Sequence, residues 1–240
     1  MAKQPKLMSP QEIHEIFKAQ TENVRELDKA WKHINRIINE AYRSDNHTLA
    51  SFQTRMLGLV FSAYAEATFS KLIHTPCCFT GEQVNQIKNE GKKDIISAWK
   101  KCIELGTDKI TSNKSNHVPN IKKKILELLD LYIKEPSLVR NKVAHGQWKV
   151  SLNRDNNAVN QDMTTKIASL SVVDLYRYKA AFDSLSGIVE DIIESPNKAH
   201  WRFYWEHVTQ FEQTQKEMAT WTVEDKIVSL KRKAGYHKVA

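Results

Sequence analysis

The sequence predicts an all-α protein, a bundle of helices with one small β-hairpin at about 147–167. Glycine and proline together supply only 13 of the 240 residues, about 5% where about 12% is usual, and the tight turns of an all-β fold depend on these residues. Most of the prolines fall between stretches in which apolar residues recur every three or four positions. This is the spacing of one face of a helix, with the prolines at the helix boundaries.

The first half of the chain predicts three helices and a loop. Ser9-Pro10 opens a helix that should run to about Tyr42, because its apolar positions step by three, four or seven. A more apolar helix is expected at 49–73, buried on more than one side. The third should cover 82–105 and end at Gly106, before a polar loop over 107–118 that projects from the body.

The second half predicts two shorter helices and then the hairpin. Asn120 should cap a helix over 121–134, and Ser137 should cap a short helix that Gly146 stops. Alternating apolar and polar residues on either side of a turn-like Arg-Asp-Asn-Asn sequence predict the hairpin. Helical spacing then returns in three further segments, which cover 172–192, 197–218 and 222–233.

These elements predict three regions. Residues 1–10 should form a flexible N-terminus, 11–219 a single helical domain, and 220–240 a C-terminal helix with a basic tail. No long uncharged apolar run is present and residues 1–10 lack the apolar core of a secretory signal, so neither a membrane span nor secretion is expected.

Charge and cysteine content indicate the kind of partner and the cellular compartment. The chain has 36 Lys and Arg against 28 Asp and Glu, and this net charge of +8 favours polyanionic partners. Cys77, Cys78 and Cys102 are an odd number with an adjacent pair, which fits neither a disulfide framework nor a zinc ligand set. We therefore expect a cytoplasmic protein in which the adjacent cysteines are buried, unreactive thiols.

Several catalytic motifs are absent from the sequence. It contains no glycine-rich phosphate loop, dinucleotide-binding fingerprint, Gly-x-Ser-x-Gly elbow or His-Glu-x-x-His pair, and we expect no cofactor and no metal. The aromatic stretch 200–207 (HWRFYWEH) could stack nucleic-acid bases. Because Trp201, Trp205 and Val208 recur at helical spacing, however, packing in the core or in an interface is the favoured interpretation.

An arginine followed after four residues by a histidine occurs three times. The pairs are Arg140/His145, Arg202/His207 and Arg232/His237. Only the first has an asparagine directly after the arginine and a glycine directly after the histidine, with apolar residues between them and a proline at the entry. On a helix, Asn141 and His145 are four residues apart and therefore share a face.

The segment 137–146 (SLVRNKVAHG) resembles the R-N-x-x-x-H form of the R-x(4–6)-H signature of HEPN domains, a helical family that includes many metal-independent endoribonucleases. The resemblance implies cleavage of RNA by attack of its own 2′-hydroxyl on the adjacent phosphate. His145 would be the general acid or base, and Arg140 would hold the phosphate. Asn141 would orient the histidine or the phosphate.

The resemblance also implies supporting residues. HEPN domains usually carry a polar or acidic residue on an earlier helix, and Glu66 is the one carboxylate between Asp45 and Glu82. We expect it to lie in an apolar helix and to hold Arg140, since a buried charge needs a partner. Lys142, Lys122 and Lys123 would add attraction for RNA phosphates.

The partners follow from the same resemblance. HEPN proteins generally form homodimers with a composite cleft, so we expect the Arg140/His145 sets of two copies to line one groove, with the first helix or the aromatic stretch as the contact surface. A toxin–antitoxin, abortive-infection or antiviral defence setting would add an antitoxin or another defence protein. Gly146-Gln147 replace the H-x-Y extension of some toxin members, which argues against a nucleotidyltransferase antitoxin.

Two other interpretations of the segment remain open. Asn141 and His145 could satisfy the backbone at a helix end while Arg140 forms a structural ion pair. The protein would then be a non-catalytic RNA-binding or dimerisation module of HEPN type, or a helical scaffold with no role in nucleic-acid chemistry.

Overall fold

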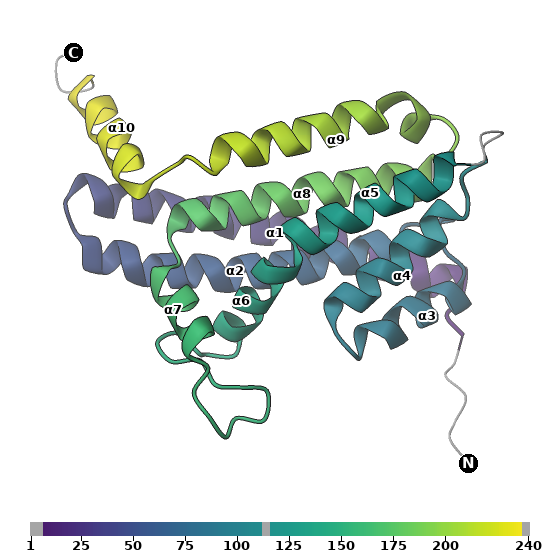
Figure 1. Cartoon of the computed structure of the whole chain (residues 1–240), viewed down its shortest axis with the longest axis horizontal. Coiled ribbons are helices and arrows are strands. Elements are labelled where there is room, and N and C mark those ends of the chain that lie inside the picture. Colours follow the sequence, from purple (N-terminus) through teal and green to yellow (C-terminus); the bar gives the residue numbers. More distant parts are fainter. Residues whose placement is uncertain (1–6, 112–115, 237–240) are drawn as a thin grey trace. The chain divides into compact units, whose positions relative to one another are not determined.

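A computed structural model describes residues 7–111 and 116–236, and these residues form ten α-helices and no strand (Figure 1). The all-α class is therefore confirmed. The helices, in chain order, are α1 Pro10–Arg43, α2 His47–Ile73, α3 Gly81–Gly91, α4 Ile95–Thr107, α5 His117–Tyr132, α6 Lys134–Ala144, α7 Gln161–Ser169, α8 Val172–Glu194, α9 Ala199–Met218 and α10 Val223–Tyr236.

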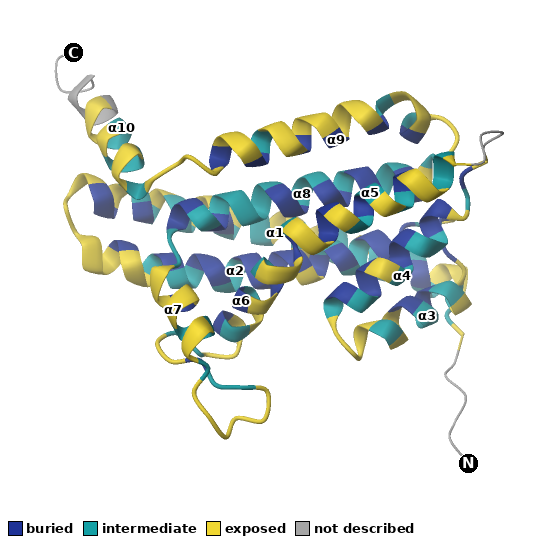
Figure 2. Ribbon diagram, viewed as in Figure 1, coloured by how far each residue is buried: buried dark blue, intermediate teal, exposed yellow. Residues whose placement is uncertain are grey.

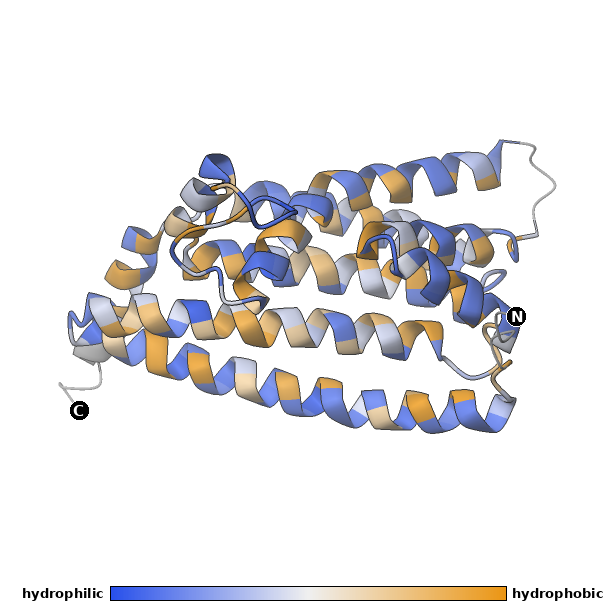
Figure 3. Cartoon of the chain, turned by 90° about the horizontal axis from the view of Figure 1, so that it is seen from below, coloured by the Kyte–Doolittle hydropathy of each residue, from blue (hydrophilic) through white to orange (hydrophobic). Residues whose placement is uncertain are grey.

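The chain folds into two compact units, each assembled from three separate stretches. The first unit consists of Met1–Val24, Ala65–Glu135 and Ala181–Gln213, and the second of Arg25–Tyr64, Pro136–Ala180 and Thr214–Ala240. Buried residues alternate with exposed ones along the long helices (Figure 2), and apolar residues recur at the same intervals (Figure 3). The predicted apolar stripes are confirmed, since Ile13, Trp31 and Ile38 of α1 are all buried.

Aromatic and branched side chains fill the first unit. The ring of Trp99 on α4 is 1% exposed, and its centroid lies 4.6 Å from that of Phe69 and 5.8 Å from that of Phe182. At Gly106, α4 approaches α8 so closely that an added Cβ would lie 2.9 Å from Ile193 Cγ2. This glycine lies inside α4 at a tight helix contact. The expectation that it ends the helix is therefore wrong.

The second unit is organised around Trp31 of α1. Its ring centroid lies 6.2 Å from that of Phe61 on α2 and 6.1 Å from that of Tyr176 on α8, both in edge-to-face geometry. The ammonium of Lys179 lies 4.2 Å from the ring centroid of Tyr64, so a cation–π contact adds to this packing.

The predicted helix over 82–105 is two helices. It breaks between Gly91 and Ile95, because Asp94 adopts an extended conformation and its carboxylate accepts the backbone N–H of Ser97 at 2.8 Å. An aspartate in this position caps a new helix start. The polar loop over 107–118 also differs from expectation, since Thr107 belongs to α4 and Ile110 is buried. Residues 112–115 of that loop lie outside the described residues.

Two helix starts precede their predicted positions. Helix α5 begins at His117 after Asn116, whose side chain makes no capping bond, so Asn120 lies within the helix. Helix α6 begins at Lys134, and Pro136 occupies its first turn, where a missing N–H costs no helical hydrogen bond. Ser137 is therefore a buried residue inside α6 and not its cap.

The predicted hairpin at 147–167 is wrong apart from one antiparallel bridge between Leu152 and Val159. Its second half forms helix α7, because the Asn160 side chain accepts the backbone N–H of Met163 at 3.0 Å and caps a helix start. Ile167 of α7 is then buried beside Val139 and Val143 of α6.

Helix α2 is the one described helix that is long and apolar enough to cross a membrane, judged by length and composition. Just over half of its most apolar window, 56%, is buried within the protein, and core helices of soluble proteins pass the same test. The expectation that no segment spans a membrane stays a prediction.

The three cysteines are free thiols. Cys78 is buried as expected, Cys102 is buried as well, and burial raises their pKa values to about 11 and about 12. Cys77, in contrast, is exposed and has a left-handed backbone with φ of 64°. The prediction of a buried pair is therefore wrong for Cys77.

The burial of His200 on α9 should make the stability of the protein depend on pH. It is 1% exposed, neither of its ring nitrogens has a hydrogen-bond partner among the described residues, and burial together with the nearby His117 lowers its pKa to about 4. An unfolded histidine has a pKa of about 6.5, so the unfolded chain binds the proton first as the pH falls. Stability is therefore lost as the pH falls from about 6.5 towards about 4.

We expect His200→Phe to remove much of this loss. A phenylalanine fills a similar volume and has no polar atom that needs a hydrogen bond. The unfolding free energy of the variant near pH 7 should therefore lie within about 1 kcal/mol of that of the wild type. Urea unfolding at several pH values measures both quantities. If the variant and the wild type lost stability in parallel on acidification, His200 would not be the group responsible.

Candidate functional site

Helix α6 carries the Arg140-Asn141…His145 segment and ends in a well-defined cap. Gly146 has φ of 74°, its N–H donates to the Val143 carbonyl at 3.1 Å, and the Gln147 N–H donates to the Lys142 carbonyl at 3.0 Å. This pair of bonds is the Schellman motif, for which glycine is the favoured residue. The cap places His145 at the C-cap position, directly after Ala144, the last residue of α6.

The inner face of α6 anchors the helix in the second unit. Val139 and Val143, four residues apart, are buried together with Ile167 of α7. The partly buried hydrophobic side chains packed against these three are Leu59, Trp148, Met163 and Leu170. Burying two valines contributes about 2 kcal/mol each, which fixes the rotation of α6 about its axis.

The segment after α6 folds back over its end. The indole N–H of Trp148 donates to the Val143 carbonyl at 2.9 Å, and the Trp148 ring lies edge-on to that of Phe52, with centroids 6.2 Å apart. The ammonium of Lys142 donates to the Leu152 carbonyl at 2.7 Å. Lys142 is thus half-buried and serves the backbone, unlike the exposed phosphate-binding lysine that the sequence suggests.

Asn141 and His145 lie on the opposite, exposed face of α6. The backbone N–H of His145 donates to the Asn141 carbonyl at 3.1 Å, which extends the helical hydrogen-bond pattern to the residue directly after α6. The predicted sharing of a face is confirmed for this pair. Leu138, 52% exposed, lies one turn before Asn141 on the same side, so the site is an open helix surface with one apolar residue at its edge.

Arg140 points in a different direction. Its guanidinium Nη1 donates to the backbone carbonyl of Ser62 on α2 at 3.0 Å, and the side chain is half-buried. On a helix, Arg140 and His145 differ by about 140° in direction, so a phosphate that contacts both would have to lie across the end of α6.

Glu66 is exposed, which contradicts the burial on which its predicted role rests. Helix α2 is apolar on most sides, but Ala63 and Glu66 form a narrow exposed strip, and a carboxylate in water needs no ion-pair partner. Glu66 belongs to the first unit and Arg140 to the second. The predicted Glu66–Arg140 pair has no support from burial.

Lys122 and Lys123 also belong to the first unit. They lie on α5, where Lys122 is half-buried and Lys123 is exposed, 4.0 Å from Glu127. Together with Pro119, Leu126 and Leu131 they line a shallow, mainly apolar depression. Among the described residues, no group of three or more His, Cys, Asp and Glu side chains is arranged to hold a metal ion.

The other two arginine–histidine pairs have different settings. Arg202 and His207 are exposed on α9, and His207 Nδ1 lies 3.2 Å from Asp191 Oδ2. Arg232 is exposed on α10, and His237 lies outside the described residues.

The aromatic stretch of α9 is only partly core. Of the three residues that were expected to pack in the core or in an interface, only Val208 is buried. Trp201 is 40% and Trp205 is 59% exposed, whereas Tyr204 and Val208 between them are buried. The Trp201 ring stacks on His117 of α5, with centroids 4.1 Å apart and planes within 3°. Base stacking and interface packing therefore remain open for the two tryptophans.

Three residues that position the segment escaped the sequence interpretation. Gly58 lets α6 approach α2, because an added Cβ would lie 3.3 Å from Val143 Cγ1. Ser62 supplies the carbonyl for Arg140, and Trp148 covers the end of α6. Of these, only Gly58 left a signal, since a glycine inside an apolar helix commonly marks close backbone approach.

Comparisons of the chain with protein-family models, with curated proteins and with solved structures gave no match.

The exposure of Glu66 predicts that it contributes little to stability. We expect Glu66→Gln to change the unfolding free energy by no more than about 0.5 kcal/mol, the usual range for an exposed site. Arg140→Met removes a charged donor from a carbonyl and should cost about 1–3 kcal/mol. Chemical denaturation compares the two, and a loss for Glu66→Gln as large as that for Arg140→Met would show that Glu66 does have a buried partner.

Proposed function

We propose that the protein is a metal-independent endoribonuclease of HEPN type. The observation that carries the proposal is the Arg140-Asn141…His145 segment itself, with Asn141 and His145 together on the open face of a capped helix end. An imidazole that is open to solvent can exchange protons with a substrate.

The proposed reaction is transphosphorylation. The 2′-oxygen of a ribose forms a bond to the adjacent phosphorus, and the bond from phosphorus to the 5′-oxygen of the next nucleotide breaks. The products are a 2′,3′-cyclic phosphate and a 5′-hydroxyl. One proton leaves the 2′-hydroxyl and one is delivered to the 5′-oxygen, so the reaction needs a general base and a general acid.

In this proposal His145 performs one of these proton transfers. Asn141, one turn before it on the same face, holds the imidazole or a phosphate oxygen. Arg140 stabilises negative charge on the phosphate, which planar guanidinium groups bind through paired donors. One copy of the chain supplies one histidine to the segment, so the second transfer falls to His145 of a second copy in the composite cleft that the resemblance implies.

The setting is part of the same proposal. A net charge of +8 favours association with RNA, and a ribonuclease active on cellular RNA needs control, as in toxin–antitoxin or antiviral defence systems. The controlling partner would be an antitoxin or another defence protein.

One contact favours the alternative, a non-catalytic HEPN-type RNA-binding or dimerisation module. Arg140 donates to the Ser62 carbonyl, which is a structural use of a residue that catalysis would assign to phosphate. In such a module the R-N-x-x-x-H residues would be kept for the packing of α6 on α2, and RNA would be bound without being cut.

We expect His145→Ala to abolish RNA cleavage and leave the fold intact. Removal of a general acid or base commonly slows a reaction by 10²–10⁴ (about two to four orders of magnitude), and His145 is exposed, so the fold does not depend on it. Gel-based cleavage of labelled RNA with far-UV circular dichroism measures both effects. His207→Ala is the matched control, because His207 is also exposed and follows an arginine by the same spacing. Equal cleavage by His145→Ala and wild type would refute the role of His145, whereas RNA binding by the wild type without any cleavage would support the binding module.

We also expect cleavage to continue in excess EDTA and to stop when the nucleotide at the cut site lacks its 2′-hydroxyl. In the proposed reaction that hydroxyl is the nucleophile, so no metal-bound water is needed. End-group analysis of the products should find cyclic phosphates. Cleavage of a 2′-deoxy substrate, or strict dependence on Mg²⁺, would refute the mechanism.

A further inference from the structure

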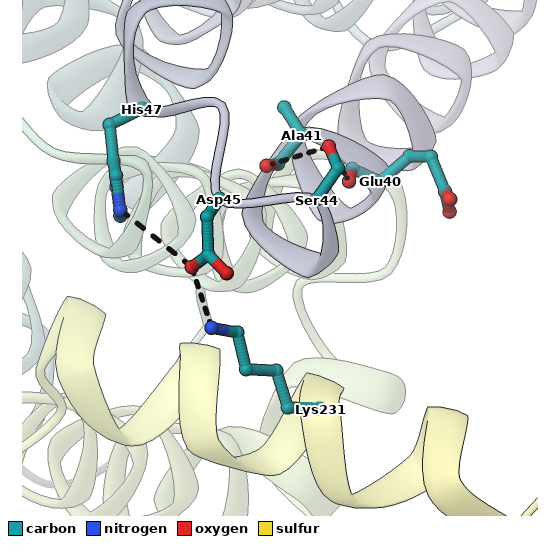
Figure 4. Close-up of polar contacts among 6 residues, drawn as sticks. All are labelled: Glu40, Ala41, Ser44, Asp45, His47 and Lys231. Atoms are coloured by element: carbon teal, nitrogen blue, oxygen red, sulfur yellow. Dashed lines mark hydrogen bonds and ion pairs between the residues drawn. The ribbon is translucent and has the colours of Figure 1, made fainter.

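Helix α10 contacts the rest of the second unit through its inner side and through the long side chain of Lys231. The Lys231 ammonium lies 2.6 Å from Asp45 Oδ1 in the turn between α1 and α2 (Figure 4), and the Lys226 ammonium donates to the Tyr176 hydroxyl at 3.0 Å. None of its side chains from Val223 to Arg232 is fully buried. The residues on the inner side, all half-buried, are Val223, Lys226, Ile227, Ser229 and Leu230.

Between Val223 and Arg232, the exposed residues of α10 lie on the opposite side and form one continuous face. At about 100° per residue, all of them fall within about 60° of Val228. We call them the α10 face; they are Trp221 directly before the helix and Glu224, Asp225, Val228, Lys231 and Arg232 within it. Trp221 is 52% and Val228 is 66% exposed, so the face presents two large apolar side chains to solvent.

The charges on the α10 face are arranged symmetrically about Val228. Two acids, Glu224 and Asp225, precede it by four and three residues, and two bases, Lys231 and Arg232, follow it by three and four. A helix with this order is complementary to a second copy of itself that runs in the opposite direction. Every acid then lies opposite a base, and the central valine lies opposite the same valine.

We propose that the α10 face binds the α10 face of a second copy of the chain, antiparallel about a two-fold axis at Val228. The contact is isologous, as closed dimers require. Val228 packs against the partner's Val228, and the acidic start of each helix faces the basic end of the other. Trp221 extends the apolar area at both ends, in keeping with the enrichment of tryptophan at interfaces.

Contacts within each copy hold the face in this arrangement. Lys231 is fixed by Asp45, and the Asp225 carboxylate accepts the Thr222 hydroxyl at 2.7 Å while the Thr222 oxygen accepts the Asp225 N–H. Helix α10 is about 21 Å long at 1.5 Å per residue, so the contact is small. The dimer is therefore weak, and both protein concentration and salt govern it.

Other occupants fit the α10 face less well. Glu224 and Asp225 would repel RNA at one end of the face. Four charged residues leave too little apolar surface for insertion into a lipid bilayer. Self-association through this face uses neither Arg140 nor His145, so it does not depend on the proposed ribonuclease activity.

The test uses the two-fold symmetry of the proposed contact, which places residue 228 of one copy opposite residue 228 of the other. Val228→Glu and Val228→Lys each place two like charges at the two-fold axis, so each variant should self-associate at least about tenfold more weakly than wild type. An equimolar mixture of the two variants places opposite charges there and should recover a dimer. Light scattering over a concentration series at low salt, without RNA, measures the association of the full chain, and circular dichroism checks the fold.

Two further variants complete the test. Glu224→Lys changes the charge order without altering Val228 and should also weaken association. Leu131→Glu changes an equally exposed apolar residue on α5 and should have no effect. A wild-type chain that is monomeric at its highest soluble concentration overturns the proposal. So does a Val228→Glu dimer as strong as wild type, a mixture that does not recover, or a dimer that only Leu131→Glu dissociates.

Discussion

At Gly58 helix α2 has no side chain, and Val143 of α6 packs into the space beside it, with its Cγ1 3.3 Å from where a Cβ would lie. This close approach brings the inner face of α6 against α2 and lets Arg140 reach the Ser62 carbonyl one turn further along. With the inner face fixed, Asn141 and His145 can only face solvent. The positions of Arg140, Asn141 and His145 follow from this one helix contact.

Periodicity predicted the long helices well, because the apolar stripes of α1 and α8 depend only on local spacing. It failed where a single polar side chain starts a new helix. Asp94 starts α4 inside a continuous helical pattern, and Asn160 starts α7 inside an alternating one. Each caps a helix with a hydrogen bond to a residue three positions on, which the apolar pattern does not show.

Part of the candidate site could likewise be predicted from the sequence, and part could not. That Asn141 and His145 share a face at a helix end follows from their spacing and from Gly146, and the structure agrees. The partner of Arg140 did not follow, because it is a backbone carbonyl and leaves no trace in residue identity. The burial of Glu66 was inferred from its apolar neighbours in sequence, but it occupies a narrow exposed strip beside Ala63, which only the packed helix reveals.

Helix α6 thus combines two functions on two faces, an inner one that anchors and an outer one that is open. Arg140 belongs to both, since it contacts α2 while remaining half-exposed next to Asn141. For the proposed chemistry, this means that the phosphate ligand and the proton-transfer group are held by the same packing contact. A disturbance at Gly58 or Val143 would therefore displace both together.

The most direct test of this dependence is a double-mutant cycle on the unfolding free energy with Gly58→Val and Val143→Ala. Gly58→Val should cost about 1–3 kcal/mol through overpacking against Val143. Val143→Ala should cost roughly 1–2 kcal/mol through lost burial. The double variant should lose less than the sum of the two by about 0.5 kcal/mol or more, because the smaller side chain makes room for the larger one. Strictly additive losses would contradict the contact between α2 and α6 on which the site depends.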